Sequence, residues 1–382
     1  MKFVIPQADF AKPLAIVARS ILPKANLPVL SNILVSTNKN KLELLSTNLE
    51  TAIKIITPCK TEREGEATIV CRSLLEFVSQ LPEGKVTLEQ LGEEVLITTD
   101  DFSARLPTMP VKEFPAIPKI EKGKELKVAA KDFARSAAKV IFCAAQDEGR
   151  PILTGILFEI KKDKLSMVAT DGYRLSYEEV PIERTDDDLE LKVVIPAKAV
   201  TEIAKIIDEN SEEYGQEDVS ITIADSLNQL NFKIGSIEFT SRLIEGEFPN
   251  WQKIIPTTFT TKAKAFKVDL IRLIRITSIF ARDSGNIVKL TFTGAHKSDK
   301  GELSVSATAS QTGSGDAKME VGLIGKGGEI AFNFRYLLEA LSVIEGDEIY
   351  FEMIESLNPG RITSVDEKGK FFHIIMPVRL QS

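Results

Sequence analysis

Residues 27–34 start with a leucine and a proline and read Leu27-Pro28-Val29-Leu30-Ser31-Asn32-Ile33-Leu34. A second copy lies 123 residues further along and reads Arg150-Pro151-Ile152-Leu153-Thr154-Gly155-Ile156-Leu157. We interpret both as strands that begin at the proline. A segment that recurs at a distance indicates a chain built from copies of one unit, so further copies are expected.

Two more kinds of segment recur. The strand-like residues 42–48 (LELLSTN) match residues 165–171 (LSMVATD), and residues 303–308 (LSVSAT) make a third copy. Three helix-like segments carry a basic residue four positions before a glutamate, which places both side chains on one helix face. These pairs are Arg72 and Glu76, Lys198 and Glu202, and Arg335 and Glu339. The sequence therefore predicts three copies of one domain.

The ends of the copies are also marked. Residues 102–106 (FSARL) recur as residues 239–243 (FTSRL), and each copy is followed by Glu-Phe-Pro, at residues 113–115 and 247–249. The proline- and lysine-rich segments 115–126 and 249–264 are typical of linkers. We predict domains at residues 1–120, 126–251 and 252–382.

Each predicted domain holds two helices and several strands. Apolar residues at spacings of three and four predict a first helix at residues 7–20, 130–144 and 267–281. A second helix is predicted at residues 72–80, 196–207 and 333–343. The alternating segments between them predict about eight antiparallel strands per domain. The predicted fold class is therefore α+β.

The composition is that of a folded protein without an evident catalytic cluster. Of the 382 residues 43% are hydrophobic and 27% are charged, and no apolar run approaches the roughly 20 residues that span a bilayer. The three cysteines, Cys59, Cys71 and Cys143, stand far apart, and the only histidines are His296 and His373. We expect a cytoplasmic protein with reduced thiols, no metal, no cofactor, no membrane partner and no enzymatic activity.

Three short motifs could carry chemistry, but each has a simpler interpretation. Thr170-Asp171-Gly172 could present a catalytic aspartate, yet a turn with glycine at positive φ accounts for it better. Residues 325–328 (GKGG) lack the spacing of a phosphate loop and are interpreted as a turn. The acidic residues 185–188 (TDDD) are interpreted as a solvated loop.

Basic residues recur on the predicted helices in all three copies. The formal net charge of −7 argues against nucleic-acid binding unless the basic residues are segregated. The basic residues of the first helices are spaced by three, four or seven positions, which keeps them on one helix face. They are Lys12, Arg19, Lys131, Arg135, Lys139, Arg272, Arg275 and Arg282. The second helices contribute Arg72, Lys198, Lys205 and Arg335. These stripes are either solvated helix faces or a surface that contacts phosphates without reading bases.

Five segments together carry a resemblance that covers essentially the whole chain. They are Met1-Lys2-Phe3, Leu27-Pro28-Val29-Leu30, Thr170-Asp171-Gly172-Tyr173-Arg174-Leu175, Phe248-Pro249-Asn250-Trp251 and Met376-Pro377-Val378-Arg379-Leu380. In these segments the sequence resembles the bacterial replicative sliding clamp, the beta subunit of DNA polymerase III.

The resemblance implies a head-to-tail homodimer whose six domains form a ring, with helices lining the inside and sheets on the outside. Such a ring encircles double-stranded DNA and tethers the replicative polymerase, so retention depends on enclosure and not on tight binding. A ring that is retained by enclosure does not need a strongly basic chain, so the net charge of −7 no longer argues against DNA as a partner. By position, the resemblance adds Lys24, Gln146 and Arg150 to the expected DNA contacts.

The resemblance also implies an apolar groove between the second and third domains, which binds short peptide motifs of the polymerase, the clamp loader and repair proteins. Its residues would be Leu153, Thr170, Gly172, Tyr173, Arg174, Leu175, Pro249, Lys253, Ile254, Asn333, Tyr336, Leu357, Pro359, Ile374, Met376, Pro377, Val378 and Arg379. Arg174 and Arg379 are expected to bond peptide carbonyls or carboxylates. The alternative for Leu153, Leu175 and Ile374 is that they are plain core residues.

Three positions depart from the family pattern. Tyr173 stands where histidine is common, Lys253 where arginine is common, and Gln381-Ser382 follow the usual terminal leucine. Peptide preference is therefore open. The alternative function is a scaffold of repeats that binds proteins but never DNA.

Overall fold

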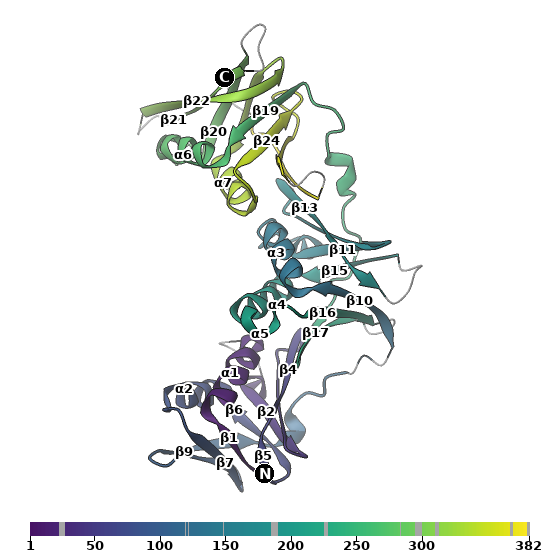
Figure 1. Cartoon of the computed structure of the whole chain (residues 1–382), viewed down its shortest axis with the longest axis vertical. Coiled ribbons are helices and arrows are strands. Elements are labelled where there is room, and N and C mark those ends of the chain that lie inside the picture. Colours follow the sequence, from purple (N-terminus) through teal and green to yellow (C-terminus); the bar gives the residue numbers. More distant parts are fainter. Residues whose placement is uncertain are drawn as a thin grey trace. The chain divides into compact units, whose positions relative to one another are not determined.

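The computed structural model describes residues 1–22, 27–118, 120, 122–147, 149–184, 190–224, 228–282, 284–294, 300–309, 313–366 and 370–379 (Figure 1). They fall into two compact units. Unit 1 comprises residues 1–134, 182–189 and 202–243, and unit 2 comprises residues 135–181, 190–201 and 244–382. Lys24, residues 185–188, His296, Gln381 and Ser382, which the sequence analysis singled out, lie outside the described residues.

In unit 1 the described strands form one antiparallel sheet of 14 strands. Its order is β14 (Glu183–Arg184), β10 (Gly123–Ala129), β16 (Asp218–Ala224), β17 (Gln229–Ile234), β18 (Ile237–Arg242), β4 (Thr51–Pro58), β3 (Lys41–Thr47), β2 (Asn32–Asn38), β6 (Gly65–Val70), β9 (Ser103–Met109), β8 (Glu94–Thr98), β7 (Lys85–Leu91), β1 (Lys2–Pro6) and β5 (Lys60–Arg63). Alternate residues of a strand point to opposite faces, and in β3 this buries Leu42 and Leu44 while Glu43 and Leu45 lie on the other face.

In unit 2 the described strands form a second antiparallel sheet, of 12 strands. Its order is β15 (Leu191–Pro196), β11 (Gly155–Lys161), β12 (Lys164–Thr170), β13 (Arg174–Pro181), β26 (Phe371–Ile375), β25 (Gly360–Ser364), β24 (Glu348–Met353), β19 (Thr261–Phe266), β22 (Gly313–Gly325), β21 (Lys300–Ala309), β20 (Ile287–Gly294) and β23 (Gly328–Asn333).

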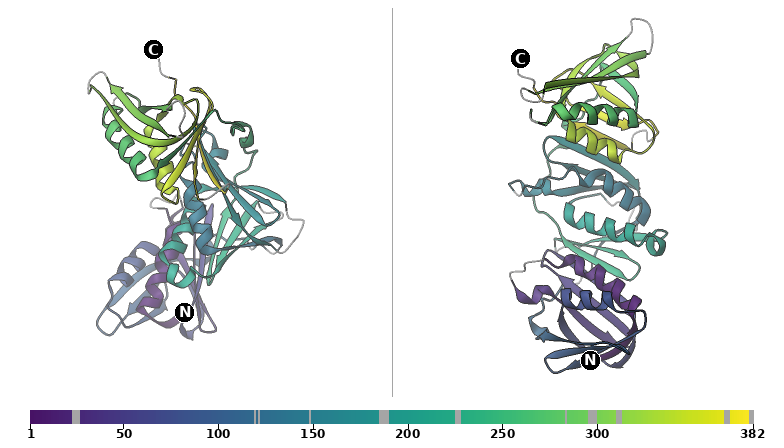
Figure 2. Two further views of the ribbon diagram at one scale, coloured as in Figure 1. Left: turned by 45° about the horizontal axis from the view of Figure 1, so that its top comes forward. Right: turned by 90° about the vertical axis from the view of Figure 1, so that its left-hand side faces the viewer.

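The helices lie close to where the apolar periodicity predicts them. They are α1 (Gln7–Val17), α2 (Cys71–Gln80), α3 (Ala130–Ile141), α4 (Ala197–Glu209), α6 (Lys267–Thr277) and α7 (Phe334–Val343), with a short α5 (Ser211–Tyr214) that was not predicted. The views in Figure 2 show helices packed on one face of the strands within each unit. In unit 1, α1 packs on α2, β3 and β4; in unit 2, α6 packs on α7, β19, β21 and β22. The α+β fold class is confirmed.

Local chemistry explains several helix ends. Short 3₁₀ turns, η1 (Ala18–Ser20) and η6 (Ser278–Phe280), extend α1 and α6, which accounts for the longer predicted ranges. The side chain of Asn333 caps α7 by accepting a hydrogen bond of 3.0 Å from the Arg335 N–H. Asp269 lies in the first turn of α6 and Arg275 in its last, and each favours the nearby end of the helix dipole.

One prediction about the repeats was wrong. The prolines do not begin strands: Pro28 and Pro151 each begin a 3₁₀ turn, η2 (Pro28–Ser31) and η4 (Pro151–Thr154), and β2 and β11 start only afterwards. Proline fixes φ near the helical range and has no N–H to lose, so it suits the first position of such a turn. The N–H of Leu30 bonds to the Leu27 carbonyl at 3.0 Å, and Leu153 does the same with Arg150.

Each sheet contains one pairing between strands of different sequence copies. In unit 1, residues 237–241 of β18 pair with residues 51–55 of β4. In unit 2, residues 371–375 of β26 pair with residues 174–178 of β13. Because β4 and β13 lie 123 residues apart in sequence, Lys54 and Tyr177 hold equivalent positions, and so do their partners. We call these two pairings junction 1 and junction 2.

Candidate nucleic-acid interface and peptide groove

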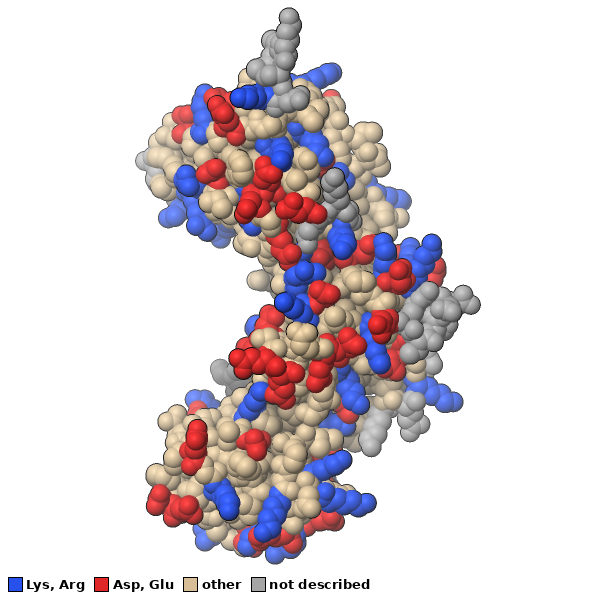
Figure 3. Space-filling model, in the orientation of Figure 1, with Lys and Arg blue, Asp and Glu red and all other residues tan. Residues whose placement is uncertain are grey.

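Most of the basic residues predicted to contact phosphates are solvent-exposed. The exposed set comprises Lys12, Arg72, Lys131, Arg135, Lys198, Lys205, Arg272, Arg275, Arg282 and Arg335, together with Gln146 and Arg150. Acidic and basic side chains are intermixed on the face drawn in Figure 3. Several of the set form ion pairs within their own helix, such as Arg72 with Glu76 at 2.8 Å. Exposed pairs of this kind are weak, so phosphates can compete for the arginines.

Two basic residues of α1 and η1 are bound by glutamates of unit 1. The Nζ of Lys12 lies 2.5 Å from Glu213. Arg19, which is half-buried, pairs with Glu202 at 3.2 Å and also with Glu209. These two residues already have opposite charges beside them, so they contribute less to a positive surface than the sequence stripe indicated.

The prediction that Lys139 faces DNA was wrong. Lys139 is 1% exposed, and its Nζ lies 3.3 Å from Glu178 and 3.5 Å from Glu345. Steps of four residues turn a helix face by about 40° each, so the last of three residues spaced in this way leaves the exposed side. The repeat contained a signal for this, because the equivalent residue of the first copy is the buried Ile16.

The segment from Thr170 to Arg174 forms the turn that the sequence predicted. Gly172 has φ +92°, a conformation that glycine adopts without strain. The Asp171 carboxylate accepts hydrogen bonds from the N–H groups of Tyr173 at 2.9 Å and Arg174 at 3.0 Å. Tyr173 is 62% exposed, and its carbonyl accepts a bond of 2.8 Å from the N–H of Met376. The turn and the C-terminal segment are therefore joined beside the predicted groove.

Arg174, which was predicted to bond peptides, makes several contacts within the protein. Its guanidinium donates to Asp171 at 3.0 Å, to the Phe142 carbonyl at 2.8 Å and to Glu339, and it lies 4.4 Å from the centre of the Tyr336 ring. Burial acts to lower the pKa of Arg174, but the hydrogen bonds to Glu339 and Asp171 together with the charges around it outweigh burial, so the pKa is raised. Arg174 thus holds the turn and lies against Tyr336, and three of its five donors are used within the protein.

Three residues of the groove set are buried, as the core alternative expects. Leu153, Leu175 and Ile374 are buried, and the last two belong to a cluster that also contains Trp251.

The remaining members of the groove set differ in exposure. The exposed ones are Gly172, Tyr173, Pro249, Lys253, Ile254, Leu357, Met376 and Arg379, with Asn333, Tyr336, Pro359, Pro377 and Val378 partly buried and Thr170 buried. A hollow of about 380 Å³ is lined by Leu357, Val378 and Arg379. It also contains Lys289, Glu329, Ile330 and Ala331, which the sequence did not indicate. These residues join the hollow because the Val378 N–H bonds to the Ala331 carbonyl at 2.8 Å, a tertiary contact without a local signature.

Sequence models of the DNA polymerase III beta subunit match the chain in three parts. The N-terminal domain matches residues 1–118, the central domain residues 127–250 and the C-terminal domain residues 252–379. The chain belongs to the DNA polymerase III beta subunit family. It is therefore a DNA sliding clamp, a non-catalytic processivity factor of DNA replication with DNA and polymerase as partners.

Relatives of known name agree with this assignment over the full length. The chain is 29% identical to the beta sliding clamp of Synechocystis sp. over 100% of both chains, and 26% identical to that of Staphylococcus epidermidis over 99% of both. The crystal structure of the Bacillus subtilis DNA polymerase sliding clamp is 25% identical, with a TM-score of 0.92 and full coverage of both chains. A Pseudomonas aeruginosa sliding clamp bound to griselimycin is also 25% identical, with a TM-score of 0.91 and full coverage of both chains.

The buried polar groups of this clamp at junction 2 are structural. Ser176 bonds to His373 Nδ1 at 2.7 Å, and the Cys143 thiol donates to Ser176 at 3.3 Å. Burial lowers the pKa of His373 to about 3, and the Arg174 charge adds to the effect. Burial raises the pKa of the Cys143 thiol to about 12. Both His373 and Cys143 are fully buried, so a substrate in solution does not reach either side chain. Among the described residues, no helix is long and apolar enough to cross a membrane.

Proposed function

We propose that two copies of this clamp close head to tail into a ring around duplex DNA. The observation that carries the proposal is a pair of unpaired strand edges that repeat the junction strands. In the third repeat the strand equivalent to β4 and β13 is β22. Each of these three strands follows a copy of the same segment, at residues 42–48, 165–171 and 303–308. The copy of β18 in the first repeat is β9, which contains most of the segment FSARL.

Both copies keep an open edge among the described strands. One edge of β22 pairs with β21. Its other edge pairs with β19 only through residues 322–325, so among the described strands this edge is open along residues 313–321. One edge of β9 pairs with β8. Its other edge pairs with β6 only through residues 108 and 109, so among the described strands this edge is open along residues 103–107. Open edges of this length favour pairing with another chain. A contact between different surfaces must close into a ring or continue as a filament.

Exposed apolar side chains accompany both edges. Phe102, next to β9, is 50% exposed. In unit 2, Ile276 of α6 and Ile279 of η6 are 49% and 54% exposed. Phe280 lies so close to Gly315 of β22 that a Cβ there would stand 2.4 Å from its ring. Apolar groups beside an open edge are typical of a surface that a partner covers.

The remaining assignments are part of the same proposal. The exposed basic residues named above, with Lys24 by resemblance, would contact phosphates without sequence preference. The exposed residues around Tyr173, Leu357 and Met376 would bind peptide motifs of the replicative polymerase, the clamp loader and repair proteins. The domain bounds 1–120, 126–251 and 252–382 and a cytoplasmic location belong to the proposal as well.

Light scattering tests the dimer. The wild-type protein should show twice the chain mass of 42.2 kDa. Ile276→Arg combined with Ile279→Arg should give the monomer mass while a labelled polymerase-tail peptide still binds. Leu357→Arg, a matched exchange at another exposed apolar residue, should leave the dimer intact and weaken the peptide. A wild-type monomer at micromolar concentration would overturn the ring.

Retention on circular DNA tests the enclosure. A clamp loaded on a nicked circle should remain in high salt and leave once the circle is cut, whereas a scaffold that never meets DNA would not depend on the cut. Arg272→Glu with Arg275→Glu should reduce loading, because phosphate contacts are lost and repulsion is added. Lys41→Glu, at an exposed residue of β3, is the control with one reversed charge. Unchanged loading of the double variant would exclude α6 from the DNA surface.

A further inference from the structure

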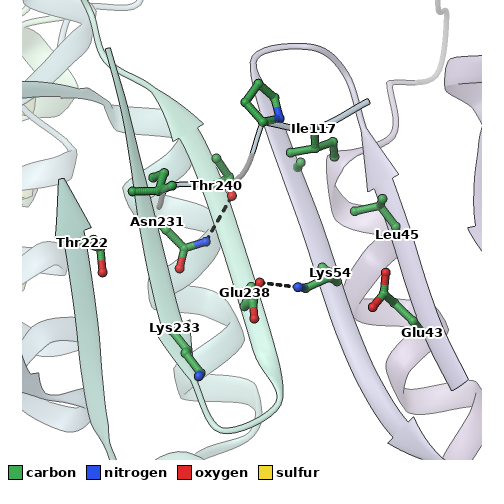
Figure 4. A pocket seen from close by; sticks show the side chains of 12 residues that line it. Glu43, Leu45, Lys54, Ile117, Thr222, Asn231, Lys233, Glu238 and Thr240 are labelled. Atoms are coloured by element: carbon green, nitrogen blue, oxygen red, sulfur yellow. Dashed lines mark hydrogen bonds and ion pairs between the residues drawn. The ribbon is translucent and has the colours of Figure 1, made fainter. Parts of the chain in front are cut away.

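Unit 1 contains a cavity of about 430 Å³ on the face of the sheet away from α1. Its floor is formed by β3, β4, β16, β17 and β18, and residues 117 and 118 pass over it (Figure 4). The volume lies within the range of about 300–1,000 Å³ that is usual for ligand sites. The lining is mixed, with charged, amide and apolar side chains, so the cavity is suited to an amphipathic group.

The sequence repeat shows what occupies the equivalent place in unit 2. The Glu-Phe-Pro motif aligns residues 113–118, the first strap, with residues 247–252, the second strap. In this alignment Ile117 corresponds to Trp251. On the floor, Lys54 corresponds to Tyr177 and Glu238 to Phe372, because each pair lies directly opposite across its junction.

In unit 2 the second strap fills its own site with an indole. Trp251 is 9% exposed, and its ring centre lies 5.2 Å from that of Tyr177 and 6.5 Å from that of Phe372. The Tyr177 and Phe372 rings are stacked at 4.7 Å. In unit 1 the smaller Ile117 is only half-buried, and the cavity remains beneath it.

We propose that the cavity of unit 1 is a docking site for an aromatic side chain, an indole above all, carried by an extended segment of a protein partner. The site would be distinct from the peptide groove and from the DNA surface.

The floor supplies contacts that suit such a segment. Lys54 and Glu238 form an ion pair of 2.5 Å, which presents a cation on which a ring can lie. The Asn231 amide donates to Thr240 at 3.1 Å, and its carbonyl oxygen can accept the indole N–H. Lys233 and Glu43 flank the ion pair on neighbouring strands (Figure 4). Their opposite charges complement a segment with an acidic residue at one end and a basic residue at the other.

The second strap supplies a probe of this chemistry. A labelled peptide of residues 247–253 (EFPNWQK) has an acidic and a basic end and a central tryptophan. It should bind the full-length protein, and methyl resonances of Ile117 and Leu45 should shift on titration. The same peptide with alanine in place of tryptophan should bind at least about tenfold more weakly, a change of roughly 1.4 kcal/mol. Equal binding of the two peptides, or no shift of these methyl groups, would overturn the proposal.

Two variants localise the site. Ile117→Trp should fill the cavity from within and weaken the peptide by about tenfold or more, while Ile117→Val leaves the cavity open and the affinity unchanged. Lys54→Tyr with Glu238→Phe copies the floor of unit 2 and should tighten binding, because the indole can then stack on rings. Undiminished binding to Ile117→Trp, or unchanged binding to the double variant, would show that the peptide binds elsewhere.

Discussion

Junctions 1 and 2 share their strand pairing but have opposite chemistry on their two faces. Toward the helices, junction 1 places Ile53 opposite Phe239, whereas junction 2 places Ser176 opposite His373. On the other face, junction 1 carries the Lys54–Glu238 ion pair, whereas junction 2 carries the stacked rings of Tyr177 and Phe372 under Trp251.

The difference shows that backbone register and side-chain chemistry are separable in these repeats. The ladder of antiparallel hydrogen bonds keeps the same five-residue pairing in both junctions. The side chains can then change, provided that each buried polar group finds a partner. At junction 2 Lys139 pairs with Glu178 and Ser176 bonds to His373 Nδ1, although the buried Nε2 of His373 has no hydrogen-bond partner among the described residues. Stability therefore comes from the aromatic face there and from the inner apolar face at junction 1.

The largest effect is expected from breaking the buried ion pair. Lys139→Ala leaves the Glu178 charge buried without Lys139, and we expect it to destabilise junction 2 by about 3–5 kcal/mol. Hydrogen exchange of the β13 and β26 amides in the full chain measures this. Lys139→Ile with Glu178→Ile copies Ile16 and Ile55 of the first repeat and should recover most of the loss. Unchanged exchange in the single variant would show that Glu178 does not depend on Lys139.

The second strap should matter more than the first. Trp251→Ala removes a buried ring and should cost about 3 kcal/mol or more at junction 2. Ile117→Ala removes a half-exposed side chain and should cost about 1 kcal/mol or less at junction 1. Amide hydrogen exchange measures both losses: rates in β13 and β26 of the Trp251→Ala variant are compared with rates in β4 and β18 of the Ile117→Ala variant. Equal losses in the two variants would contradict the difference drawn between the straps.

Acid should weaken junction 2 selectively. The pKa of His373 is lowered to about 3 in the folded chain, against about 6.5 in the unfolded chain. Between these values the unfolded chain binds a proton that the folded chain does not, so stability falls as pH falls, by at most about 1.4 kcal/mol per pH unit. Above about pH 6.5 this contribution is constant.

The control for the acid effect copies junction 1. Ser176→Ile with His373→Phe replaces both polar groups by the residues found at Ile53 and Phe239 and should remove this slope from the pH profile of β13 and β26 exchange. An identical profile in the wild type and the double variant would assign the acid sensitivity to another group.

The smallest effect is expected at the ion pair of junction 1. Lys54 and Glu238 are only partly buried, and pairs of this kind contribute about 1 kcal/mol or less. Lys54→Ala or Glu238→Ala should therefore change exchange of β4 and β18 little, and less still in high salt. A loss as large as that of Lys139→Ala would show that the two junctions do not differ in where their stability lies.

Much of the fold could be predicted because its signals are local. Helix α3 repeats α1 in its apolar spacing, and the copied segments at residues 42–48 and 165–171 both became strands, β3 and β12. The turn at Gly172 was predictable as well, since the short Asp171 side chain and the glycine that follows determine it within a few residues. The prediction that Pro28 and Pro151 begin strands was wrong because proline is tolerated at the start of a strand and at the start of a 3₁₀ turn alike.

The site could be predicted only in part, because burial is a property of contacts distant in sequence. The sequence by itself determined the three copies, the alternation along each strand and the exposed basic residues on the helices, since period and composition express these directly. Only the tertiary structure decided that Lys139 is buried against Glu178, that Arg174 is held by Asp171 and Glu339, and that the first strap leaves a cavity where the second places an indole. Each of these depends on which side chain of another element lies opposite, and no local pattern records that partner.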